Sequence, residues 1–114
     1  MDPLPKMNNR RLMLDSELRD FLGLKENDSD HLYFQPPESV KLKFDAIIYK
    51  KLGLDARRAD DGIYSLQDTY HLVIVTRDPD SPLPHDFQIR FPKASPGKVY
   101  VSENLYHHPF TLTY

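Results

Sequence analysis

The feature that most constrains the fold is a run of four apolar residues, Leu72–Val75, followed by an acidic turn that contains proline. A strand without a polar face is typical of the interior of a sheet, so we expect this strand to be central and covered on both faces. Pro79 lacks a backbone donor and biases Asp78 towards extended conformations, which ends the strand. Ser81 and Pro82 have the order of a helix cap and a first helical residue, so a helix is predicted to follow.

Apolar periodicity predicts the remaining helices and strands. Between Asn8 and Leu24, apolar residues recur at spacings of three and four, and Gly23 is placed to end a helix. A second, short helix is predicted at Pro84–Phe91. Strands are expected at His31–Gln35, Ala46–Tyr49, Ile63–Leu66, Val99–Val101 and Phe110–Tyr114.

Two segments are predicted to lack regular structure. Residues 1–7 contain Pro3 and Pro5 and are expected to form a flexible N-terminal arm. Residues 51–62 show neither a period of 2 nor one of 3.6, and they include two glycines and two adjacent aspartates. We therefore expect a long loop between two strands in this segment.

The order of these elements predicts a single α+β domain over residues 1–114. We expect a largely antiparallel or mixed β-sheet, with the N-terminal helix and the short second helix packed on one face. Apolar residues make up 39% of the chain, below the roughly 45–50% of an average globular protein. A subunit of a larger assembly therefore fits the composition well, with a monomer of modest stability as the alternative.

Charge and composition disfavour several classes of protein. The net charge of −2 lacks the basic excess that a general nucleic-acid binder needs. The chain has no cysteine, which excludes disulfides and thiolate chemistry and suits folding in the cytosol. No apolar run has the roughly 18 to 20 residues needed to span a bilayer, and no signal peptide is recognised. We therefore expect a soluble protein that is not secreted and has no membrane partner.

A search for catalytic chemistry assigns no catalytic residue, metal ligand or cofactor. Asp78 and Asp80 have the chemistry of a carboxylate pair, but turn formation explains both more simply. His107 and His108 are neighbours in an extended segment, where adjacent side chains point to opposite faces, so they do not share a metal ion. A small hydrolase that uses Asp78, Asp80 and His85 remains an alternative function.

Five groups of short segments occur in a fixed order along the chain. They are Tyr33-Phe34-Gln35-Pro36-Pro37, Ala46-Ile47-Ile48-Tyr49, Ala59-Asp60 with Tyr64, Tyr70–Ser81, and Tyr100-Val101 with Asn104-Leu105-Tyr106-His107. This ordered series resembles the small neck and tail-completion proteins of long-tailed bacteriophages. The nearest resemblance is to the tail terminators, also called tail-to-head joining proteins, and it covers about residues 33–114. Similar sequences tend to have Tyr-Pro before the second strand, where this chain has Phe44 and Asp45.

The resemblance implies a structural virion protein in the neck of the tail rather than an enzyme. Tail terminators form a ring, usually a homohexamer, that caps the finished tail tube and joins it to the head-side connector. The implied partners are further copies of the chain, the tail tube protein and the connector or stopper protein. DNA would pass through the lumen without specific binding, and assembly would take place in the host cytoplasm. A head-completion or stopper protein is the alternative within the same class.

The segment between residues 51 and 62 supplies the candidate contacts between subunits. Arg57 and Arg58 are followed closely by Asp60 and Asp61, so both signs of charge occur together. Such a segment can pair with complementary charges on an adjacent copy. Tyr64 completes this set of interface candidates, and a solvated loop is the alternative interpretation.

Overall fold

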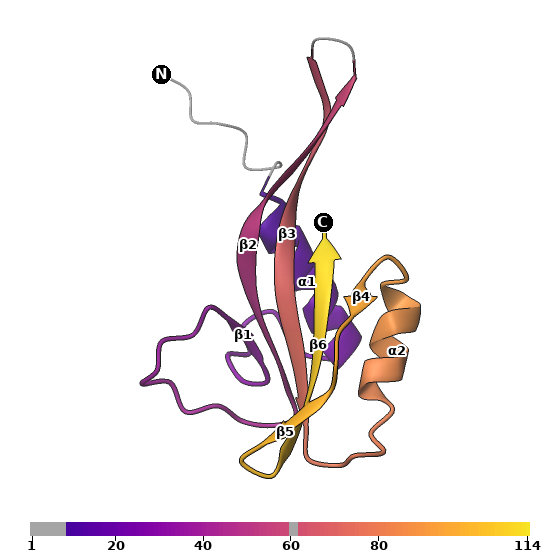
Figure 1. Cartoon of the computed structure of the whole chain (residues 1–114). Coiled ribbons are helices and arrows are strands. Elements are labelled where there is room, and N and C mark those ends of the chain that lie inside the picture. Colours follow the sequence, from indigo (N-terminus) through magenta and orange to yellow (C-terminus); the bar gives the residue numbers. More distant parts are fainter. Residues whose placement is uncertain (1–8, 60–61) are drawn as a thin grey trace.

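The computed structural model of the chain describes residues 9–59 and 62–114. It contains two helices and one mixed sheet (Figure 1), which confirms the predicted α+β class. Strand β1 runs parallel to β2, and the other pairings are antiparallel, in the order β1-β2-β3-β6-β4 with β5 also paired to β6. The elements are α1 (Arg10–Leu22), β1 (Leu32–Phe34), β2 (Ala46–Ala59), β3 (Gly62–Thr76), α2 (Leu83–Arg90), β4 (Ser95–Pro96), β5 (Tyr100–Ser102) and β6 (Leu105–Thr113).

Strand β3 is the central strand, as its apolar run predicts. It pairs with β2 on one edge and with β6 on the other. Leu72 and Ile74 are fully buried in the core between the sheet and the helices, and Val75 is also fully buried. Val73 is only partly buried, on the opposite face of the sheet. The prediction that both faces are covered is therefore met only in part.

Helix α1 forms where the periodicity predicts it, with capping residues at both ends. The side-chain oxygen of Asn9 accepts a hydrogen bond from the backbone N–H of Leu12 at 3.2 Å. Gly23 ends the helix with a φ of 72°, a left-handed conformation that glycine adopts without steric cost. Leu14 and Leu18, spaced by one helical turn, are fully buried against the sheet. The cap and the apolar spacing together fix the position of this helix.

Helix α2 packs beside α1 through an aromatic cluster around Phe87. This ring lies 5.8 Å from that of Phe21 on α1 and 4.8 Å from those of Phe91 and Phe110. Both helices therefore cover the same face of the sheet, as predicted (Figure 1). The helix begins at Leu83, one residue before the predicted range of Pro84–Phe91 and one residue after Pro82, which the capping pattern placed first. The Ser81 hydroxyl accepts a hydrogen bond from the Leu83 N–H at 3.3 Å.

The prediction of a long loop at residues 51–62 is wrong, because nearly all of these residues belong to two paired strands. Strands β2 and β3 continue as an antiparallel ribbon to the pair Ala59 and Gly62, and Figure 1 shows this ribbon projecting away from the rest of the sheet. The pairing register shifts between Lys51 and Gly53 and again between Arg57 and Arg58. Each shift inserts a residue and exchanges the two faces, which erases the alternation that identifies a strand in sequence. Residues 1–7, the predicted arm, lie outside the described residues.

Strand β6 is longer than predicted and begins at Leu105 instead of Phe110. Pro109 lies within it, and a proline normally argues against a strand because it cannot donate to the ladder. The Pro109 carbonyl still accepts a hydrogen bond from the Gly97 N–H at 2.8 Å. Strands β5 and β6 are joined by Glu103 and Asn104 with φ values of 53° and 64°, as in a tight hairpin turn.

Asp45, just before β2, forms hydrogen bonds with residues next to the end of β3 and the start of β1. Its carboxylate accepts a hydrogen bond from the Arg77 N–H at 2.9 Å, which links the start of β2 to the end of β3. Its backbone oxygen lies 2.8 Å from the ring nitrogen Nδ1 of His31, just before β1. The peptide between Phe44 and Asp45 is cis.

The aromatic cluster predicts a matched pair of stability effects on α2. Phe87 is fully buried, so Phe87→Ala should lower the free energy of unfolding by about 3–5 kcal/mol through lost burial and a cavity. Ile89 lies on the same helix but is 67% exposed, so Ile89→Ala should change it by less than about 0.5 kcal/mol. Urea denaturation of both variants tests this. Equal losses would contradict the placement of α2.

Two tyrosines with raised pKa values make the free energy of unfolding depend on pH in the alkaline range. Burial, followed by the hydrogen bond that its hydroxyl donates to Asp15 at 2.5 Å, raises the pKa of Tyr49 far above its ordinary value. Burial and the neighbouring Glu17 carboxylate raise the pKa of Tyr114 to about 12. Below the unfolded-state pKa of about 10, the stabilisation from these neutral tyrosines is complete.

The free energy of unfolding should therefore fall between pH 10 and pH 12, because the unfolded chain loses tyrosine protons that the folded chain retains. Urea denaturation at pH 9, 10, 11 and 12 measures this, and Tyr49→Phe should make the decline shallower. A flat profile in the native chain would show that these hydroxyls are not buried as described.

Candidate functional site

The candidate interface residues lie at the far end of the projecting ribbon. In the backbone, Arg57 pairs with Ser65 across the two strands, and Tyr64 belongs to β3. Arg58 also belongs to β2, whereas Asp60 and Asp61 lie outside the described residues. The predicted set is thus carried mostly on strands. Its role in subunit contacts stays a prediction.

The ribbon, defined here as residues 53–59 and 62–67, extends past the neighbouring strands. Tyr114 exchanges two backbone hydrogen bonds with Asp68, at 2.9 and 3.2 Å, and strand β1 reaches only to the level of Tyr49. Beyond those points, within the described residues, β2 and β3 pair only with each other. A two-stranded hairpin alone is marginally stable in water. In the described residues, the ribbon therefore lacks the support that a third strand would give it.

Two exposed leucines give one face of the ribbon an apolar surface. Leu54 is 66% exposed and Leu66 is 50% exposed. In the pairing of β2 with β3, Leu66 lies opposite Ala56. Two pairs closer to the body of the sheet, Leu54 lies opposite Asp68. Because alternate residues of a strand share a face, Leu54, Ala56 and Leu66 lie on the same side of the ribbon. We call these three residues the ribbon stripe.

Sequence reasoning missed the ribbon stripe, although a signal for it was present. Asp61 and Gly62 form the dipeptide that favours a tight hairpin turn, and apolar residues such as Leu54 and Leu66 stand on both sides of it. Leu66 already ends the predicted strand at Ile63–Leu66, and reading these residues as a hairpin would have placed Leu54 on a strand as well.

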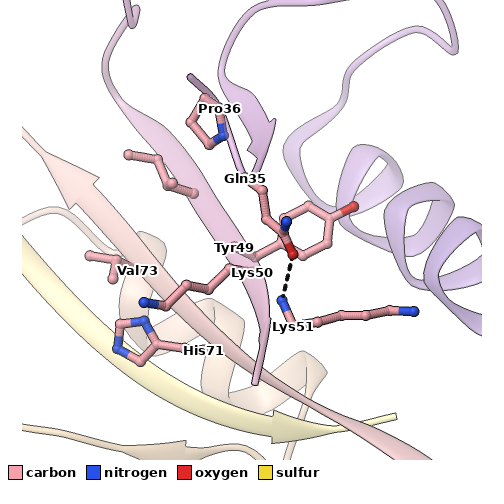
Figure 2. A pocket seen from close by; sticks show the side chains of 8 residues that line it. Gln35, Pro36, Tyr49, Lys50, Lys51, His71 and Val73 are labelled. Atoms are coloured by element: carbon pink, nitrogen blue, oxygen red, sulfur yellow. Dashed lines mark hydrogen bonds between the residues drawn. The ribbon is translucent and has the colours of Figure 1, made fainter. Parts of the chain in front are cut away.

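A second apolar surface lies on the face of the sheet opposite the helices, where no helix of the described residues packs (Figure 1). It is a hollow of about 570 Å³ that is open to solvent (Figure 2). We call it the sheet hollow, and its lining comes from β2, β3 and the segment after β1. The lining residues are Gln35, Pro36, Ile48, Tyr49, Lys50, Lys51, His71 and Val73.

Strand register explains why these side chains meet. Ile48 lies opposite Val73, and Lys50 lies opposite His71, on neighbouring strands. Figure 2 shows the end of the Lys50 side chain alongside the His71 ring, between that ring and Val73. The carbonyl oxygen of the Gln35 side chain accepts a hydrogen bond from the Lys51 N–H at 3.1 Å and fixes one wall. The hollow therefore has an apolar floor with a basic group at its edge.

Asp78 and Asp80, which the hydrolase alternative uses, form a turn on the surface. A carboxylate oxygen of Asp78 accepts a hydrogen bond from the Asp80 N–H at 2.9 Å, and the Thr76 hydroxyl donates one to the Asp78 carbonyl at 3.1 Å. Both aspartates are exposed. The side chain of His85 is 81% exposed and lies 4.0 Å from Asp86. These contacts give Asp78 the role of a turn former.

The side chains of the two adjacent histidines of β6 lie on different faces of the sheet and have different neighbours. The His107 ring stacks on that of Tyr100 with centroids 4.7 Å apart. His108 lies near the buried Thr76, with 3.4 Å between its Nε2 and the hydroxyl oxygen. Burial, and then the charge of His107, lowers the pKa of His108. In the described part of the chain, no group of three or more histidine and carboxylate side chains is arranged to hold a metal ion.

No family model matches this chain, and no curated protein or solved structure matches it either. Within residues 9–59 and 62–114, neither helix has the length and apolar character that crossing a bilayer requires. The features of this chain that bear on its function are therefore the ribbon stripe, the sheet hollow and the order of the segments along the chain.

The turn predicts how substitutions at Asp78 affect the protein. Asp78→Ala removes the oxygen that accepts from Asp80 and should lower the free energy of unfolding by about 0.5–1.5 kcal/mol. Asp78→Asn keeps an acceptor oxygen in the same place and should lower it by less than about 0.5 kcal/mol. Thermal and urea denaturation of both variants test this. A loss as large for Asp78→Asn would mean that the negative charge, and not the turn geometry, matters.

Proposed function

We propose that this protein is a structural virion protein of a long-tailed bacteriophage, the tail terminator. In this role, copies of the chain form a ring, a homohexamer by the family pattern, that caps the tail tube. The ring joins the tube to the head-side connector or stopper protein in the neck of the virion. Assembly takes place in the host cytoplasm, and the role is structural, not catalytic.

The ordered series of segments that resembles the family supports this proposal. Tyr33 and the residues after it lie on and beside β1, and Ala46–Tyr49 opens β2. Tyr70–Ser81 covers the buried half of β3 and the turn that ends it. The last pieces fall on β5 and at the start of β6. The described segments of the series thus lie on or next to the strands of a single sheet.

The observation that carries the proposal is the projecting ribbon. It has Leu54 and Leu66 exposed on one face and lacks any neighbouring strand within the described residues. Exposed leucines on a marginally stable hairpin favour association, because burial of apolar surface contributes roughly 25 cal/mol per Å². A chain with such an extension is suited to be a subunit that its neighbours complete.

The charge of the chain suits a ring through which DNA passes. With a net charge of −2, the subunit does not attract the phosphate backbone as a basic protein would. DNA then moves through the lumen without specific binding. Tight binding of duplex DNA at physiological salt, measured by gel mobility, would contradict this part of the proposal.

Ring formation and attachment to tails test the proposed function together. Native mass spectrometry of the purified chain should show one closed oligomer, and negative-stain images should show rings. When the protein is mixed with isolated tail tubes or with DNA-filled heads of the same phage, the rings should cap the tubes. Binding to heads alone would instead identify a head-completion or stopper protein. A monomer that binds neither particle would overturn the proposal.

A further inference from the structure

We propose that the ribbon stripe of one copy fills the sheet hollow of the next copy, so that a second copy of this chain is the occupant of the hollow. This inference rests on the proposed ring and names the surfaces that build it. Both surfaces come from described residues: Leu54, Ala56 and Leu66 on the ribbon, and the eight lining residues around Ile48 and Val73 on the sheet.

The geometry of the chain requires that the contact is between copies. Strands β2 and β3 run without interruption through both the hollow and the ribbon. Leu54 follows Lys50 by four residues on β2, a distance of about 13 Å along an extended strand. A continuous strand cannot fold back onto its own face, so the stripe of one chain cannot enter the hollow of the same chain.

The sheet hollow is incomplete without a cover. The run Leu72–Val75 has no polar face, a pattern typical of strands buried on both sides. The helices cover one side, which buries Leu72 and Ile74 completely. Val73 points to the other side and remains partly exposed in the hollow with Ile48. An apolar side chain from a neighbouring copy would complete the burial that the sequence pattern predicts.

The charges beside the two surfaces are complementary. Lys50 and His71 lie side by side in the hollow, above its apolar floor (Figure 2). At the base of the ribbon, Asp68 lies opposite Leu54 and on the same face as the stripe, and its carboxylate lies 3.6 Å from the Lys51 ammonium of its own chain. A leucine beside a carboxylate thus matches an apolar hollow edged by a lysine. Such complementarity favours one register of docking over others.

The two surfaces differ, so the contact is heterologous. Each copy has one stripe and one hollow, and each hollow receives the stripe of a different copy. Contacts of this type generate a closed ring when the rotation between copies closes, and an open filament when it does not. The same surfaces therefore account for a ring without a second kind of interface.

Site-directed cross-linking tests the contact, because the chain has no cysteine of its own. A Leu54→Cys protein mixed with a Val73→Cys protein under mild oxidation should give a disulfide-linked pair. As a control, Leu54→Cys mixed with Ile89→Cys should give none, since Ile89 is more exposed than the partly buried Val73 but lies on α2. A Leu54→Cys protein that cross-links mainly to itself would indicate contact between two ribbons and would overturn the inference.

Complementation between two defective variants supplies a second test. One double variant, Leu54→Lys with Leu66→Lys, places charges on the stripe so that it no longer docks. The other, Lys50→Glu with Val73→Lys, places a charge on the floor of the hollow and reverses the charge at its edge, so that the hollow no longer accepts a stripe. Each variant alone should stay at the 13.4 kDa of one chain, with circular dichroism showing that it is folded. Mixed together, they should form a 1:1 species of twice that mass and nothing larger, because one intact stripe meets one intact hollow. Absence of this species from a mixture of folded variants would overturn the inference.

These outcomes separate the inference from the proposed function. If the native chain forms rings that cap tail tubes while Leu54 and Val73 fail to cross-link, the docking surfaces are wrong and the terminator role stands. If the cross-link forms and the rings do not cap tubes, the contact between copies is established and the proposed function fails.

Discussion

The pairing of β3 with β2 on one edge and with β6 on the other is the interaction on which the rest of the structure depends. It aligns Leu72 with Tyr49 and Phe110, and so creates the apolar face that both helices cover. The same strand continues into the ribbon and, on its other face, supplies Val73 and His71 to the sheet hollow. The core and both candidate surfaces therefore share one element.

The sequence predicts those parts of the fold in which local and tertiary signals agree. Gly23 and the spacing of Leu14 and Leu18 predict α1, and the apolar run predicts the central position of β3. Two signals were misleading for physical reasons. The bulge at Lys51 and Gly53 exchanges the strand faces and hides the ribbon. Pro109 lies within a strand whose partners tolerate it, and so hides half of β6.

The candidate site was harder to predict than the fold because it depends on register. Gln35, Ile48 and His71 come from three separate segments, and only strand pairing brings them around one hollow. The stripe likewise exists only because Leu66 lies opposite Ala56 and two pairs from Leu54. No local pattern encodes such cross-strand neighbours. The interface candidates predicted from the sequence are therefore mostly the charged residues near the turn, and they do not include the leucines of the ribbon stripe.

Hydrogen exchange of the ribbon amides at two protein concentrations tests the central claim, that neighbouring copies complete this chain, most directly. At high concentration, amides of residues 53–56 and 66–67 should exchange slowly, because the ribbon is held against the next copy. On dilution to single chains they should exchange fast, while amides in the middle of α1 and β3 keep their protection. Ribbon protection that is the same at both concentrations would contradict the account, because the ribbon would then be stable without a partner.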